Sequence, residues 1–201
     1  MLAPTLPSSS EDELPPRKRF TSAEVVRMMD FGLFEGKRYE LIDGDLIDKM
    51  GQNPPHASVV RKVQRVLLRI CGDDRVLVQQ PIEAAVEDRV WSTPEPDVAV
   101  LKAVGDEEFE QRHPRGDELV LVVEVSDTTA RHDSTTKRDL YARAGVPEYW
   151  VVDVTRRLLR VHRDLSNAAF GEITEIRDGS LTVVCATGVM IPVTELLPRI
   201  R

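Results

Sequence analysis

The alternation of apolar and polar residues predicts a series of β-strands along the chain. The run "LVLVVEVS" at 119–126 is mostly apolar and β-branched, which is typical of a strand buried on both faces. The segment "RYELIDGDLIDKM" alternates on both sides of Asp43-Gly44, and this pattern strongly favours a hairpin. The remaining predicted strands lie within 75–80, 96–102 and 148–155, followed by short strands with turns after Arg157.

Apolar residues at helical spacing predict helices between these strands. In the longest segment, apolar residues recur every three or four positions until Gly72, and glycine is a common helix stop. Together with the strands, the helices predict an α/β (α+β) fold with a central mixed β-sheet flanked by helices. The predicted helical segments are a short helix capped by Thr21 or Ser22, 57–72, 133–146 with Asp133 or Ser134 as its cap, and a last turn at 193–197.

The length of 201 residues suits one domain with its own core. Residues 1–19 combine proline, serine and charge without a period, so we expect a flexible arm followed by a single domain at 20–201. A charged loop is expected at 105–117. The sequence shows no signal peptide and no apolar run long enough to cross a bilayer, and we therefore expect a soluble, cytoplasmic protein without a membrane partner.

Composition narrows the classes of partner. Cys71 and Cys185 follow apolar residues and lack metal-ligand spacing, so we interpret both as reduced packing residues. The net charge of -7 gives no reason to expect broad affinity for nucleic acid. A polyanion would have to be bound by a local basic patch or by metal ions. No glycine-rich phosphate loop is present, and no small-molecule cofactor is expected.

Glu124 carries the first candidate chemistry, because it lies toward the C-terminal end of an apolar strand, where an ionised side chain is costly to bury. On that strand Val122, Glu124 and Ser126 share one face. Asp97 begins the next apolar strand upstream, directly after Pro96. If the two strands are adjacent, their carboxylates lie close together and require a proton or a divalent cation between them. Such a site suits phosphoryl chemistry.

Lys137 is the third element of this hypothesis. It lies early in the predicted helix after the Glu124 strand and shares a face with Leu140 and Tyr141. A cation there opposes the helix dipole and needs a compensating partner. Asp133, four residues earlier, could supply a simple ion pair, and only the combination with the two acids favours a functional role.

The segments "EPDVAVL", "LVVEVSDTT" and "KRDLYARAGVPEYWVVD", in this order, resemble the Uma-two family of restriction-endonuclease-like proteins in the PD-(D/E)XK nuclease superfamily. The similarity also takes in "YELIDGDL" and the histidine near the start of the long helix, so that it spans roughly 39–153. By matching motifs, Asp97 resembles the aspartate of "PD", Glu124 the acid of "EXK", and Glu40 an additional glutamate. Ser126 stands where the simplest pattern has lysine, and Lys137 is the matching candidate.

The resemblance implies a restriction-endonuclease-like core and metal-assisted hydrolysis of DNA phosphodiester bonds. Asp97, Glu124 and the backbone carbonyl of Val125 would hold Mg²⁺ or Mn²⁺, and Lys137 would orient the attacking water or stabilise charge on the phosphate. Glu40 would hold a second ion or position the site, although its place in an alternating strand equally suits a solvent-facing residue.

A second class of function stays open at this stage, namely a non-catalytic nucleic-acid-binding or assembly module on the same fold. The acidic net charge and the displaced lysine favour it. His56 can cap a helix, contact substrate or have no chemical role, and the spacing of the remaining histidines makes a zinc site unexpected. A homodimer is expected in either case, because two-fold pairs are the commonest oligomers and a duplex has two strands.

Overall fold

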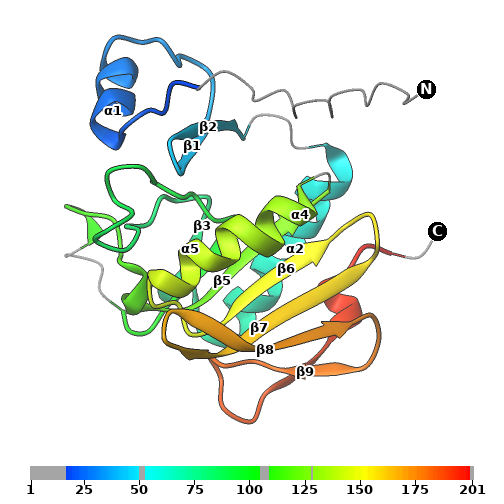
Figure 1. Cartoon of the computed structure of the whole chain (residues 1–201). Helices are drawn as coiled ribbons and strands as arrows, with labels where there is room; N and C mark the ends of the chain where they lie inside the picture. Colours follow the sequence, from blue (N-terminus) through cyan, green and yellow to red (C-terminus); the bar gives the residue numbers. More distant parts are fainter. Residues whose placement is uncertain (1–16, 50–52, 105–108, 128, 200–201) are drawn as a thin grey trace, which may run out of the picture.

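A six-stranded sheet forms the centre of the computed structural model, which describes residues 17–49, 53–104, 109–127 and 129–199 (Figure 1). Its strand order is β3-β4-β5-β6-β7-β8, and β5 and β6 are its parallel pair while the other neighbours are antiparallel. The mixed sheet confirms the predicted fold class. Its strands are β3 (Val76–Val78), β4 (Val98–Leu101), β5 (Leu119–Ser126), β6 (Tyr149–Asp153), β7 (Leu158–Ser166) and β8 (Ala169–Ile176).

The remaining strands of the described residues form two small two-stranded sheets. In the β1–β2 hairpin, Asp43 and Gly44 have φ of 51° and 83°, the left-handed conformations that a tight two-residue hairpin turn requires. The hairpin at Asp43-Gly44 is therefore confirmed. A bridge between Leu41 and Thr93 fixes it against the segment that leads into β4. The bounds are β1 (Tyr39–Ile42) and β2 (Asp45–Asp48), and β9 (Ser180–Thr182) and β10 (Met190–Pro192).

Helices cover both faces of the main sheet (Figure 1). The first helix has the expected cap, because the Thr21 hydroxyl accepts from the Glu24 amide and the Glu24 carboxylate accepts from the Thr21 amide. The long helix begins at Pro54, three residues before its predicted start, since Asn53 caps it and proline fits its first turn. The helices are α1 (Ser22–Asp30), α2 (Pro54–Cys71), α4 (Ala130–His132), α5 (Arg138–Arg143), the short η1 (Asp73–Arg75), η2 (Gly116–Glu118) and η4 (Val193–Glu195), and the π-helical turn η3 (Asp133–Lys137).

The core is divided by the sheet into two layers, as the alternation along the 119–126 strand predicts. Leu121, Val123 and Val125 pack with the apolar face of α2 and with residues of the C-terminal segment. Val122, on the opposite face, packs with Tyr141 of α5. Glu124 shares the face of Val122. The crossover from β5 to β6 through α4, η3 and α5 therefore lies over the face that carries Glu124.

Three sequence expectations need correction. The helix after β5 begins at Ala130, so that Asp133 lies inside it rather than at its cap. Tertiary contacts explain this, because the Asp133 carboxylate accepts hydrogen bonds from Ser126 and Thr129 instead of from helix amides. The strands after Arg157 are not all short, since β7 has nine residues and β8 eight.

The third correction concerns the cysteines, which are joined by a disulfide instead of being reduced. Cys71 ends α2, and Cys185 lies between β9 and β10, where the C-terminal segment packs on that helix. The two residues are 114 positions apart in the sequence, so no local pattern predicts their meeting.

Two further expectations concern segments that the structure describes only in part. Of the predicted arm at 1–19, residues 17–19 are described and the others lie outside the described residues, as do 105–108 of the predicted loop. Among the helices of the described segments, none combines the length and apolar character needed to cross a membrane.

His162 of β7 provides a prediction about stability. Its ring is fully buried between Tyr149 and Phe170, and neither ring nitrogen has a hydrogen-bond partner within the described ranges. Burial and the charges of Arg138 and Arg160 lower its pKa to about 4, against a small opposing effect of Asp139. The neutral ring is therefore favoured in the folded protein.

We expect His162→Phe to reduce the acid sensitivity of folding. An unfolded histidine binds its proton near pH 6.5, whereas His162 in the folded protein does so near pH 4, so the wild type loses stability as the pH falls through this window. The phenylalanine variant should lose about 2 kcal/mol less free energy of unfolding between pH 7 and 4.5. Urea denaturation at both pH values measures this, with the exposed His113→Phe as control. Equal pH dependence of His162→Phe and wild type would contradict the prediction.

Candidate active site

A cavity of about 250 Å³ opens at the end of the main sheet where β4 begins and β5 ends. The β1–β2 hairpin, the start of α2 and the turn η3 contribute residues to its lining. Figure 1 shows this hairpin above the main sheet and near α2 and α4. Charged side chains dominate its lining. The lining residues are Glu40, Ile47, Asp48, Lys49, Asn53, His56, Asp97, Glu124, Val125, Asp127, Thr129, His132, Asp133 and Lys137.

Asp97 and Glu124 lie opposite each other, as the sequence predicts. In the antiparallel pair of β4 and β5, Val98 is paired with Val123, and continuing this register by one residue places Asp97 opposite Glu124. Both residues are buried, with exposed fractions of 1% and 2%. Asp97 Oδ2 accepts a hydrogen bond of 2.9 Å from the Val125 amide, whereas its buried Oδ1 has no partner among the described residues. Such an unpaired buried oxygen is costly and can serve as a ligand.

Lys137 lies between two glutamates. Its Nζ is 2.7 Å from Glu40 Oε1 and 2.8 Å from Glu124 Oε1, and 3.9 Å from Asp133 Oδ1. The turn η3 is π-helical, a local irregularity that recurs at functional sites, and it turns Lys137 into the protein interior. The ion pair with Asp133 is thus present, but the two glutamates are closer partners. Lys137 thus lies on the inward face that it was predicted to share with Leu140 and Tyr141.

Glu40 is buried, so the alternative of a solvent-facing strand residue is wrong. The isolated bridge at Leu41 holds β1 over the end of the sheet, and Glu40 therefore faces the cavity. Its Oε2 accepts from the Glu95 amide at 3.2 Å, while Oε1 contacts Lys137.

Ser126 and Tyr141 fix the surroundings of these acids. Ser126, which occupies the place of the expected lysine, donates from its hydroxyl to Asp133 Oδ2 at 2.5 Å and so ties β5 to η3. The Tyr141 hydroxyl donates to Glu124 Oε1 at 2.7 Å. Glu124 is consequently held by one lysine and one tyrosine.

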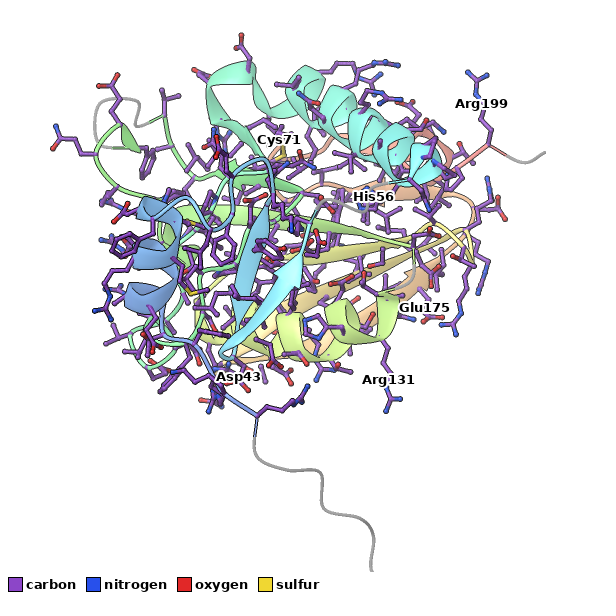
Figure 2. All side chains as sticks on the ribbon, turned by 90° about the horizontal axis from the view of Figure 1, so that it is seen from above. Asp43, His56, Cys71, Arg131, Glu175 and Arg199 are labelled. Carbon is purple, nitrogen blue, oxygen red and sulfur yellow. A yellow bond between two sulfur atoms is a disulfide. The ribbon has the colours of Figure 1, made fainter. Side chains whose placement is uncertain are left out.

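Two residues of the site were not identified as site residues from the sequence. Lys49, after β2, lies 3.8 Å from Glu40 and 3.9 Å from Glu124, and donates to the Glu95 carbonyl at 3.1 Å. His56, in the first turn of α2, has its Nε2 3.5 Å from Asp97 Oδ2. Figure 2 shows His56 between the ribbons of α2 and the sheet. The sequence signals for His56 are its place near a helix start and its part in the family resemblance, which left substrate contact as one of three roles, whereas Lys49 gives no signal.

Burial raises the pKa of both Asp97 and Glu124, while the neighbouring cations lower it, and the balance differs between the two residues. Burial acts to raise the pKa of Asp97, but His56, Lys49 and the Val125 amide together lower it to about 2. Asp97 is therefore an anion at neutral pH. Burial raises the pKa of Glu124 in spite of Lys137 and Lys49, and the pKa of Lys137 is raised against its burial by Glu124 and Glu40. The lysine consequently stays charged.

The donor set suits a hard divalent cation. The cavity contains four inner carboxylates, those of Glu40, Asp97, Glu124 and Asp133, against the ammonium groups of Lys49 and Lys137. Asp97 raises the pKa of His56 against the effect of its burial, and even with a protonated His56 the four carboxylates, when ionised, leave an excess of negative charge. Asp97 Oδ1 is free to bind, and oxygen ligands are those that Mg²⁺ prefers. Within the described segments no three acidic, histidine or cysteine side chains are arranged as a metal cluster, but Mg²⁺ sites often use only one or two carboxylates.

Comparisons with known proteins agree with this picture. A family model named Uma2, described as "Putative restriction endonuclease", matches residues 24–188. In the fold comparison, the chain is similar to a crystal structure described as a putative nuclease belonging to DUF820 from Anabaena variabilis ATCC 29413. The similarity has a TM-score of 0.65 and 14% sequence identity, and covers 88% of this chain and 97% of that one. No curated protein matches. The structural match confirms the predicted nuclease-like fold.

Proposed function

Because the chain belongs to the Uma2 family, whose description is "Putative restriction endonuclease", we propose that it is a metal-dependent endonuclease that hydrolyses DNA phosphodiester bonds. The observation that carries the proposal is the unpaired Oδ1 of Asp97, buried opposite Glu124 in a cavity that also contains two lysines. Paired acids with nearby cations suit phosphodiester hydrolysis, because charge develops on the phosphate in the transition state.

The residues proposed to hold Mg²⁺ or Mn²⁺ are Asp97, Glu124 and the backbone carbonyl of Val125. When bound, the ion would supply Lewis-acid polarisation of a phosphate oxygen and acidify a water molecule. The contribution of the chain is to keep these ligands in place. Asp97 is fixed through the Val125 amide, and Glu124 through Lys137 and Tyr141.

The two lysines have different access to a substrate. Lys137 has an exposed side-chain fraction of 2% and already contacts Glu40 and Glu124, so its first role is to keep both carboxylates in position. The Lys49 side chain is 11% exposed and its Nζ donates a hydrogen bond to a neutral carbonyl, while its carboxylate neighbours among the described residues lie nearly 4 Å away. Lys49 is therefore better placed to contact a phosphate, and Lys137 contributes positive charge from behind the carboxylates.

Cleavage of supercoiled plasmid tests the proposal. The purified protein should nick the plasmid in the presence of Mg²⁺ or Mn²⁺, and nicking should stop when EDTA is added. Mn²⁺ binding, measured by electron paramagnetic resonance, gives a second readout that does not depend on turnover. A folded protein that neither binds Mn²⁺ nor nicks DNA would contradict the proposal and favour a non-catalytic module. The expected homodimer stays a prediction that sedimentation can test.

Lys49→Met should slow plasmid nicking about 100-fold, the typical loss when one donor to developing charge is removed. Lys49→Arg should retain more activity because it keeps the charge. The matched control is Lys37→Met, which removes an exposed lysine from the turn before β1. Nicking rates at saturating metal measure the effect. A Lys49→Met variant as active as the control would exclude a role for this residue at the phosphate.

A further inference from the structure

The helix α2 has an unusual balance of charge. Its eighteen residues include Arg61, Lys62, Arg65 and Arg69 but neither aspartate nor glutamate. In a chain with 34 acidic residues among 201, a segment of this length would contain about three. The protein as a whole has a net charge of -7, so the net charge of this helix is opposite in sign to that of the rest of the molecule.

The four cations lie on one side of α2. At about 100° per residue they span roughly 100° of the helix circumference, on the side opposite the buried Val59, Val63 and Val66. Arg61 and Arg65 are exposed, and in the described segments neither forms an ion pair. Lys62 donates to a neutral group, the Leu197 carbonyl, at 2.6 Å, and no carboxylate among the described residues pairs with it. Arg69 is paired with Glu195.

More cations adjoin this side from distant parts of the chain. Arg157, at the turn between β6 and β7, donates to the carbonyl of Pro198, which is next to the residue that Lys62 contacts. Its guanidinium also lies 3.9 Å from the exposed Asp178, a loose ion pair at the surface. Burial, together with the charges of Arg199 and Arg157, lowers the pKa of Lys62, which agrees with their proximity. Figure 2 shows the Arg199 side chain extending outward at the edge of the molecule beside α2.

This basic surface, defined by Arg61, Lys62, Arg65, Arg157 and Arg199, is next to the cavity. The first turn of α2 contains His56, which faces Asp97. On the other side of the rim, the Thr155 hydroxyl donates to Asp127, and Asn53, the cap of α2, also bonds Asp127. The start of the helix and the β6–β7 turn are thus both bonded to Asp127, which lines the cavity. Figure 1 shows the N-terminal end of α2 and the end of β6 on the same side of the molecule.

We propose that the basic surface binds the backbone phosphates of duplex DNA beside the scissile bond and guides the duplex to the cavity. The inference rests on the proposed nuclease function and adds a substrate-binding surface to it. Arginine and lysine side chains spaced along a helix bind phosphates without reading sequence, and they supply affinity that the acidic remainder of the molecule lacks. The spacing of Arg61 and Arg65, one helical turn apart, lets both reach one strand.

Fluorescence anisotropy with a labelled 20-base-pair DNA duplex in EDTA tests this surface without cleavage. Arg61→Glu/Arg65→Glu should bind at least about tenfold more weakly than the wild type, and its plot of log Kd against log salt should lose about two units of slope. The matched control Arg27→Glu/Lys37→Glu makes the same charge change at exposed residues of α1 and the following turn, and should stay within about twofold of the wild type.

Equal affinity of the two double variants would overturn the proposal, as would a wild type that does not bind duplex DNA at low salt. An RNA duplex bound about tenfold more tightly than DNA would overturn the assignment to DNA. Plasmid nicking separates this result from the nuclease proposal. If the wild type nicks the plasmid, and both double variants nick it equally fast and bind the duplex equally tightly, the nuclease proposal stands and the proposal of a DNA-binding surface on α2 is rejected.

Discussion

Asp97→Asn is expected to remove metal-dependent nicking, with a loss of at least about 1000-fold, because it takes away an anionic ligand of the proposed ion. Asp97 offers a buried Oδ1 without a partner among the described residues, and its low pKa keeps it an anion at neutral pH. The asparagine keeps an oxygen that can accept from the Val125 amide, so that the fold should survive. Initial nicking rates with Mg²⁺ and Mn²⁺, together with Mn²⁺ binding, measure the change.

The matched control for this substitution is Asp153→Asn. Asp153 is as buried as Asp97, with 2% exposure, and lies at the end of β6, opposite Ser126 in the parallel register. Its carboxylate accepts from the Arg156 amide and does not line the cavity. The control should therefore keep both activity and Mn²⁺ binding. If Asp97→Asn nicks like this control, the activity comes from another site or from a contaminating nuclease.

The positions of Asp97, Glu124 and Lys137 relative to one another could be predicted, because they follow from the periodicity of single strands and helices. A strand places alternate side chains on one face, so Glu124 could be assigned to the face of Val122 from the sequence alone. Two adjacent apolar strands, each carrying one acid, then brought Asp97 and Glu124 together. The helical spacing of Lys137 and Tyr141 gave the direction of the lysine. These inferences need only neighbouring elements of the chain.

The residues around this centre could not be predicted from the sequence, because long-range packing brings them to the site. Lys49 reaches Glu124 because the β1–β2 hairpin folds over the sheet end, and nothing in its own segment indicates that position. The apolar spacing predicts a helix that begins after His56, whereas the Asn53 cap starts the helix earlier, and His56 in its first turn contacts Asp97. The pairing of Cys71 with Cys185 likewise depends on how the C-terminal segment packs on α2.

The charges of the site also have a cost for folding. Glu40 and Glu124 are buried in the same cavity, and their mutual repulsion and loss of hydration must be offset. Lys137 is the closest cation to both, since its Nζ is within hydrogen-bonding distance of each carboxylate. We infer that this lysine contributes to stability as well as to the proposed reaction. Lys49, almost 4 Å from the same carboxylates, can replace only part of that contribution.

Lys137→Met is accordingly expected to lower the free energy of unfolding by about 3 to 5 kcal/mol, the typical cost of leaving buried charges without their partner. Urea denaturation at pH 7 in EDTA measures this without interference from bound metal. The neighbouring Arg138→Met is the control, because it removes an exposed ion pair with Asp139 that should contribute less than about 1 kcal/mol. A loss in Lys137→Met no larger than in the control would show that the carboxylates do not depend on the lysine.

A second substitution separates the role of Lys137 in positioning charge from simple packing. Glu124→Gln in the Lys137→Met background removes one of the two carboxylates that have lost their closest cation and keeps the side-chain volume, so part of the lost stability should return. The Tyr141 hydroxyl can still donate to the amide oxygen of the glutamine. If the double variant is instead less stable than Lys137→Met by the full effect of Glu124→Gln alone, the two residues act independently. Their coupling in the folded protein would then contribute little, and Lys137 would stabilise it mainly through the packing of its aliphatic chain.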